Sequence, residues 1–147
     1  MKTSSGWFRR SALLVLLGSG AVGAAEVQTG TVVVVATGFE SEKGEVLIQL
    51  ANSRADYEAD DDGFKLAKIK ASGGKAEHRF EGVPYGEYAI KIFHDENSNE
   101  ELDIGWTGPE EVYGFSNGAR GTLGPPDWDD AKFTLREPEH TAKIEVK

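Results

Sequence analysis

The sequence predicts an all-β fold, a single β-sandwich of about seven to eight short strands. Segments rich in β-branched and aromatic residues, or alternating between apolar and polar residues, recur along the chain. Turn residues separate these segments about every 8–12 residues, a spacing typical of β-sandwiches. No long segment has the apolar spacing of an amphipathic helix.

The first two expected strands cover residues 31–39 and 45–52. "TVVVVATGF" is a continuous β-branched run, as expected for a strand that is central in a sheet. "SEKG" supplies a turn before "EVLIQLAN", so the two segments are expected to form a hairpin. The acidic stretch 53–64 reads as a loop with room for one helical turn.

Alternation predicts the next strands, over residues 65–71, 76–83 and 83–95. The last of these has the clearest pattern of the chain. Its alternation puts Tyr88, Ile90 and Ile92 on one face and Ala89, Lys91 and Phe93 on the other.

Residues 96–130 are rich in glycine and interrupted by proline, so only 111–116 is expected to form a strand there. Two more strands are expected at 131–137 and 141–147.

The N-terminus predicts export. Lys2, Arg9 and Arg10 precede the apolar run "SALLVLLGSGAVG", and small residues follow, which is the pattern of a signal peptide cleaved after Ala24 or Ala25. An uncleaved anchor is the alternative, but the run is shorter than the roughly 20 residues of a membrane span. The expected organisation is therefore a signal peptide over 1–25 and one domain over 26–147. The mature protein is expected to be periplasmic or secreted, without membrane insertion.

The charge balance excludes several classes of partner. Removal of residues 1–25 takes away three basic and no acidic residues, so the formal net charge changes from −9 to −12. Such a chain is not expected to bind nucleic acid or anionic lipid, which both need a basic surface. The absence of cysteine excludes thiol catalysis and thiolate metal sites. With three histidines, a zinc site of the usual His-rich kind is not expected.

Residues 95–103 have the spacing of a calcium loop. Acidic and amide residues stand at positions one, three, five and nine, and position seven can offer a backbone carbonyl, which suits a cation that takes about six to eight oxygen ligands. The predicted ligands are Asp95, Asn97, Asn99, the Glu101 carbonyl and Asp103. His94 is expected to be a polar residue at the strand end, because imidazole is a poor ligand for calcium.

The twelfth position of this loop should be a bidentate Glu, but the chain has Trp106 there. The sequence offers several substitutes for this ligand, and they predict a low affinity of about 10⁻⁴–10⁻³ M. The substitutes are Asp60, Asp61, Asp62, Glu110, Glu111, Asp127, Asp129 and Asp130. The alternative is a polar turn without an ion, because Asp and Asn side chains also cap their own backbone.

A second segment, residues 112–128, combines aromatic residues with glycine and proline. Its rings could form an exposed platform that stacks on a peptide, protein or carbohydrate ligand. The alternative is a satellite core in which these rings are buried. The predicted platform consists of Trp106, Tyr113, Phe115 and Trp128, with Arg120 as its polar group.

Three stretches resemble one known family. "GEVLIQLANS", "VPYGEYAIKIFHDENSNEELD" and "YGFSNGARGTLGPPDWDDAKF" are similar to domain of unknown function 2141, and the resemblance covers nearly all of residues 30–147. It implies an exported immunoglobulin-like or prealbumin-like β-sandwich and supplies no activity. Members commonly read "HDENGNG", whereas this chain has Glu100 in place of the last glycine. Glycine takes left-handed backbone freely, and glutamate pays about 1 kcal/mol for it.

The sequence shows no activated nucleophile, so an enzyme is not expected. We expect an exported binding or interaction module with a weak calcium site. A purely structural envelope domain without metal is the alternative, and a hydrolase is a further one.

Overall fold

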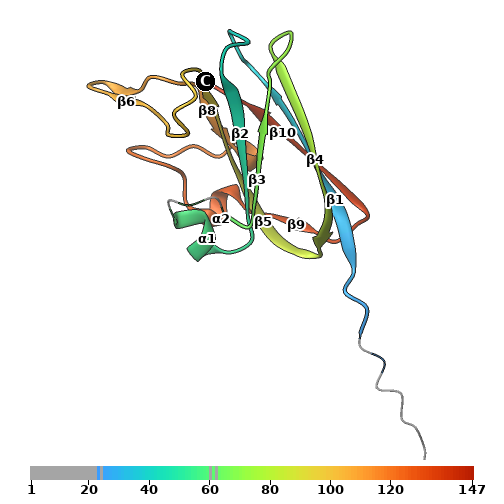
Figure 1. Ribbon diagram of the computed structural model, residues 1–147. Helices are drawn as coiled ribbons and strands as arrows, with labels where there is room; N and C mark the ends of the chain where they lie inside the picture. Colours follow the sequence, from blue (N-terminus) through green and yellow to red (C-terminus); the bar gives the residue numbers. More distant parts are fainter. Residues whose placement is uncertain (1–22, 24, 60, 62) are drawn as a thin grey trace, which may run out of the picture.

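The computed structural model describes residues 23, 25–59, 61 and 63–147, which fold as a β-sandwich (Figure 1). In this part of the chain ten strands are formed. They are β1 (Thr29–Thr37), β2 (Glu45–Ala51), β3 (Lys65–Ile69), β4 (Lys75–Pro84), β5 (Gly86–Asp95), β6 (Ile104–Gly105), β7 (Gly108–Pro109), β8 (Tyr113–Phe115), β9 (Phe133–Leu135) and β10 (Glu139–Glu145). The helices are α1 (Arg54–Glu58), α2 (Trp128–Ala131) and the 3₁₀ turn η1 (Ser116–Gly118).

The strands form two facing sheets. One has the order β10-β1-β4, and the other has the order β3-β2-β5-β8, with β9 pairing the first residues of β5. The two-residue strands β6 and β7 pair only with each other. Setting this small pair aside, the described residues contain eight strands, so the predicted all-β sandwich of seven to eight strands is confirmed.

Strand β1 is central in its sheet, as its β-branched run predicts. It pairs in parallel with β10 and antiparallel with β4. Because both edges of β1 are occupied, none of its backbone is left to pair with β2. The expected hairpin between 31–39 and 45–52 is therefore wrong: residues 38–44 cross from one sheet to the other. Two glycines with positive φ, Gly38 (102°) and Gly44 (62°), bound this crossing.

Strand β5 confirms its predicted alternation. Tyr88, Ile90 and Ile92 are buried in the main core between the sheets. Ala89 points to the outer face and belongs to a second cluster of buried residues. This second cluster consists of Ala51, Tyr57, Ala89, Phe115, Trp128 and Ala131.

The second cluster lies where α1 and α2 cover the outer face of the β2–β5 sheet. Helix α1 is the helical turn expected within 53–64, and the Ser53 hydroxyl caps it by accepting from the Asp56 N–H at 3.1 Å. Helix α2 was not expected, because residues 128–131 were assigned to loop and strand. Its four residues present Trp128 and Ala131 inward, so it is formed by packing rather than by sequence periodicity.

The predicted signal peptide falls on residues 1–25, of which all but 23 and 25 lie outside the described residues. Export therefore stays a prediction. Within the described part of the chain, no helix is long and apolar enough to cross a membrane.

Ser116 joins β5 to the end of α2 inside the protein. Its buried hydroxyl accepts the Ile90 N–H at 2.8 Å and donates to the Ala131 carbonyl at 2.6 Å. We expect Ser116→Ala to lower the free energy of unfolding by about 2 kcal/mol, because both backbone groups lose a buried partner. Urea denaturation measures this change. The control is Ser72→Ala at an exposed position, and an equal effect of both variants would contradict this role of Ser116.

The lowered pKa values of two histidines predict how the free energy of unfolding depends on pH. His78 and His140 are paired with the buried Val34 and Val32 of β1 and pack against Phe80 and Phe133. Burial lowers the pKa of both below the usual 6.5, while the charge of Glu137 partly opposes the shift at His140. The unfolded chain therefore takes up protons first, and the free energy of unfolding should fall as the pH decreases through 6.5.

This dependence should be measured by urea denaturation between about pH 5.5 and 8, above the range where most carboxylates titrate. The double variant His78→Gln, His140→Gln is expected to reduce the slope. An unchanged slope in the double variant would contradict the assignment.

Candidate functional site

The 95–103 loop begins at a carboxylate that is fully buried. Asp95 has 0% of its surface exposed, and its two oxygens accept the backbone N–H groups of Asn99 at 3.1 Å and Glu100 at 2.8 Å. These bonds fold the loop back onto the end of β5. Asp95 thus fixes the backbone of the loop. Its place as the first predicted ligand does not by itself predict this structural role.

The three polar side chains at positions three, five and nine meet above this base. The amide nitrogens of Asn97 and Asn99 donate to the two carboxylate oxygens of Asp103, at 2.5 and 2.9 Å. The amide oxygens face the backbone, where they accept from the N–H groups of Asn99 and Glu101 at 3.1 and 3.0 Å. Three of the predicted ligand residues are therefore brought together by their side chains, while the side chain of the fourth, Asp95, bonds to the loop backbone. Glu101 follows them in the same loop and donates its N–H to Asn99.

The backbone of the loop is left-handed at two non-glycine residues. Ser98 has a φ of 58° and Glu100 a φ of 65°. Glu100 stands at position six, where calcium loops require glycine for a sharp turn. The chain thus has the left-handed backbone of this sharp turn although the glycine is replaced by Glu100. The Glu100 carboxylate forms an exposed ion pair with Lys68 of β3.

Glu111 closes the 95–103 loop. Its carboxylate accepts the Glu96 N–H at 3.0 Å and the Asp103 N–H at 3.2 Å, and so joins both ends of the loop. Of the substitutes proposed for the missing twelfth ligand, Glu111 is the one whose carboxylate bonds to the loop. Glu110 lies beside it, and its N–H donates to the Asp103 carbonyl at 2.8 Å.

The remaining substitutes that the structure describes lie in other parts of the fold. Asp61 pairs with Gly63 and Gln49, Asp129 pairs with Arg54 and Lys132, and Asp127 and Asp130 lie on or beside α2. Asp60 and Asp62 lie outside the described residues. The sequence could not choose among these carboxylates, because the choice depends on how residues 104–110 turn back.

His94 lies on the inner side of the same strand end and is only 1% exposed. Its Nε2 lies 2.7 Å from the carbonyl oxygen of Lys43, and its ring packs edge-on against Phe39. Its Nδ1 lies 3.7 Å from a carboxylate oxygen of Glu96. As expected for neighbours on a strand, His94 and Asp95 form no dyad, and their hydrogen bonds go to different partners.

The predicted aromatic platform is wrong as a shared exposed surface. Phe115 and Trp128 are buried in the second cluster, and the half-buried Tyr113 packs against it. Trp106 is fully exposed in the turn between β6 and β7, which projects from the sandwich at the end away from α1 and α2 (Figure 1). The rings are buried because the outer face of β5 needs an apolar cover, which is the satellite-core alternative.

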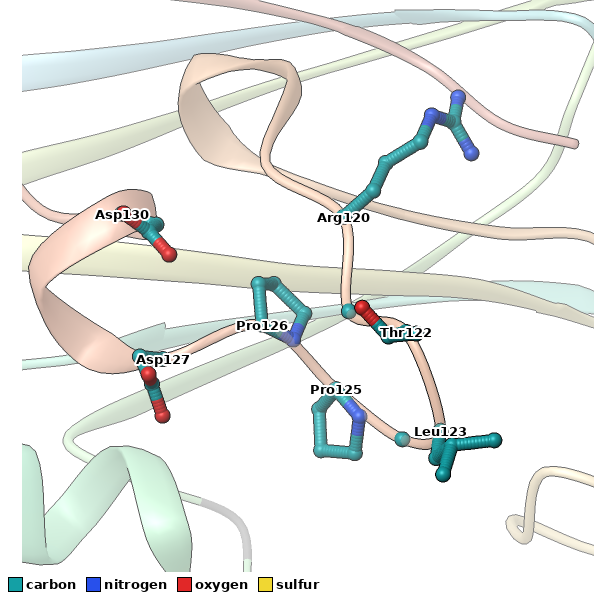
Figure 2. A pocket seen from close by; sticks show the side chains of 9 residues that line it. Arg120, Thr122, Leu123, Pro125, Pro126, Asp127 and Asp130 are labelled. Carbon is teal, nitrogen blue, oxygen red and sulfur yellow. The ribbon is translucent and has the colours of Figure 1, made fainter.

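Arg120, the polar group of the predicted platform, borders an open cavity of about 340 Å³ (Figure 2). The cavity is formed mainly by the turn through residues 121–126, and the Arg120 side chain extends away from Leu123 and the two prolines (Figure 2). Arg120 therefore does not form a common site with the buried aromatic residues.

A second cavity of about 210 Å³ lies between the two helices and is bordered by Tyr57, Lys91 and Trp128. Burial, together with the charges of Asp127 and Asp130, raises the pKa of Tyr57 to about 12. Its hydroxyl thus stays protonated and donates to the Pro126 carbonyl at 2.9 Å. Lys91 donates to the Tyr57 carbonyl at 2.6 Å, so both side chains have structural partners.

Among the described residues, no group of three or more His, Asp or Glu side chains is arranged to hold a metal ion. The 95–103 loop differs from such a group because two of its converging side chains are amides.

Comparisons with known proteins identify the family of this chain. Neither the curated proteins nor the solved structures gave a match. One family profile does match, over residues 34–143, and this span includes both the 95–103 loop and the segment that covers the outer face. Because the match covers more than half of the chain, the protein belongs to the family described as "Uncharacterized protein conserved in bacteria (DUF2141)".

Proposed function

We propose that this protein is an exported β-sandwich interaction module whose 95–103 loop binds calcium weakly. One observation carries the proposal: the side-chain amides of Asn97 and Asn99 both bond to the Asp103 carboxylate, in a loop whose backbone is held by the buried Asp95. Calcium is bound by carboxylate, amide and carbonyl oxygens that one loop supplies.

The ion-free loop needs one local change to bind the ion. In the structure the amide nitrogens of Asn97 and Asn99 point to Asp103. A half-turn of each amide would present its oxygen instead and would give three convergent oxygen-bearing groups. The Glu101 carbonyl and an oxygen of Asp95 would complete the protein ligands, and Glu111 is the nearest further carboxylate.

Low affinity follows from the composition of this set. Only Asp95 and Asp103 carry charge among the ligands, and Glu111 is already bonded to two backbone N–H groups. Few charged ligands favour a dissociation constant of about 10⁻⁴–10⁻³ M, the range of extracellular modules. Such affinity suits a protein that is exported into a calcium-containing medium.

The partner would be a protein, a peptide or a carbohydrate, and Trp106 is the residue that supports this part of the proposal. Its ring is fully exposed in the β6–β7 turn, directly after the loop. Exposed aromatic rings provide contact area for peptides and sugar rings at a low entropic cost. Calcium would stiffen the base of the hairpin through Asp103, whose carbonyl accepts the Glu110 N–H.

Calcium should raise the thermal stability of the purified protein. At a concentration about 100-fold above the dissociation constant, binding to the folded state alone adds about 2.7 kcal/mol. For a domain of this size the melting temperature should rise by on the order of 10 °C relative to excess chelator. Magnesium should have a much smaller effect, because it requires shorter and more regular coordination.

The informative variant is Asp103→Asn. Asp103 is half-buried and its loss should abolish the calcium shift, whereas replacing the fully buried Asp95 would damage the fold itself. Asp130→Asn, at an exposed position in α2, is the matched control and should keep the full shift. Equal melts of the natural protein in calcium and in chelator would instead support a purely structural envelope domain with a capped turn.

A further inference from the structure

The inner side of the same strand end carries a pair of groups that the calcium proposal does not use. Nδ1 of His94 is the one buried side-chain nitrogen or oxygen without a hydrogen-bond partner in the described part of the chain. Buried polar atoms are nearly always paired, so an orphan atom of this kind needs an explanation.

The tautomer of His94 follows from its surroundings. Nε2 lies 2.7 Å from the Lys43 carbonyl oxygen, which can only accept a hydrogen bond, so Nε2 carries the proton. In the neutral ring Nδ1 then carries a lone pair, and a carboxylate oxygen of Glu96 lies 3.7 Å away. Two acceptors that face each other repel unless a donor or a positive charge lies between them.

We propose that His94 Nδ1 and the Glu96 carboxylate bind a borderline divalent metal ion of the zinc type, with water completing the coordination. An ion at about 2.1 Å from each atom would span the 3.7 Å separation with an angle of roughly 120° at the metal, close to tetrahedral.

Both proposed ligands have a second hydrogen-bond partner, as metal ligands usually do. A ligating histidine normally donates its other ring N–H to a carbonyl or carboxylate, as Nε2 does to Lys43. The ligating carboxylate is normally hydrogen-bonded as well, and Glu96 accepts from the Ser41 hydroxyl at 2.8 Å. Both supports come from the 38–44 crossing between the sheets. The Glu96 side chain is half exposed, while His94 Nδ1 is buried.

This metal site is distinct from the 95–103 loop. His94 and Asp95 point to opposite faces of β5, and nitrogen is a ligand for zinc or copper rather than for calcium. With two protein ligands the site should bind less tightly than sites with three or four. Copper should bind more tightly than zinc, following the general order for first-row divalent ions.

The test is to titrate the purified protein with Zn²⁺ at neutral pH and to follow the histidine ring nitrogens by NMR. Before zinc, His94 should show a protonated Nε2 and an unprotonated Nδ1. Zinc should shift the Nδ1 signal of His94 before those of His78 and His140, which lie on the other sheet. Ca²⁺ should instead affect the side-chain amides of Asn97 and Asn99, so each of the two proposals can fail alone.

Glu96→Gln is the informative variant, because replacing the buried His94 could unfold the strand end. We expect Glu96→Gln to weaken zinc binding at His94 by about tenfold or more. Glu81→Gln, the same change at an exposed position of β4, should leave it unaltered. The proposal is overturned if Nδ1 is already protonated at neutral pH, if zinc shifts His78 or His140 first, or if Glu96→Gln binds zinc as tightly as the natural protein.

Discussion

Strand β5 has to be covered on both faces, and the rest of the molecule is arranged around this requirement. Its inner residues Tyr88, Ile90 and Ile92 lie in the core between the sheets. Its outer residue Ala89 is equally buried, because α1, α2 and the segment around Phe115 pack over it. One edge of β5 pairs with β2 and the other with β8 and β9, so its backbone is fixed along nearly its whole length.

A strand fixed in this way provides a rigid base for whatever follows it. Alternation sends His94 to the inner side and Asp95 to the outer side of the strand end, and both are buried. The outer side meets a loop of oxygen-bearing side chains, and the inner side meets the crossing that begins after β1. Two neighbouring residues thus enter environments of different chemistry, and we propose a different kind of metal ion for each.

Most aromatic side chains of the segment 112–128 are not available to a partner, because they cover the outer face of the β2–β5 sheet. In a domain without disulfides, stability depends on apolar burial, and Phe115, Trp128 and Tyr57 supply it in the second cluster. Trp106 differs because its hairpin projects beyond the sandwich and has no sheet beneath it. The Trp106 ring is therefore exposed because of where the β6–β7 hairpin lies.

The sequence by itself determined the fold class, the position of most strands and the alternation of β5, because these depend on residue periodicity along one segment. The candidate calcium ligands were also predicted from the sequence, since their spacing is local, and they stay a prediction. Tertiary structure alone decided that β1 pairs with β4 and β10, because pairing depends on which edges remain free. It also decided that Glu111 closes the loop. These choices join residues from separate segments, and local spacing contains no information about which segments meet.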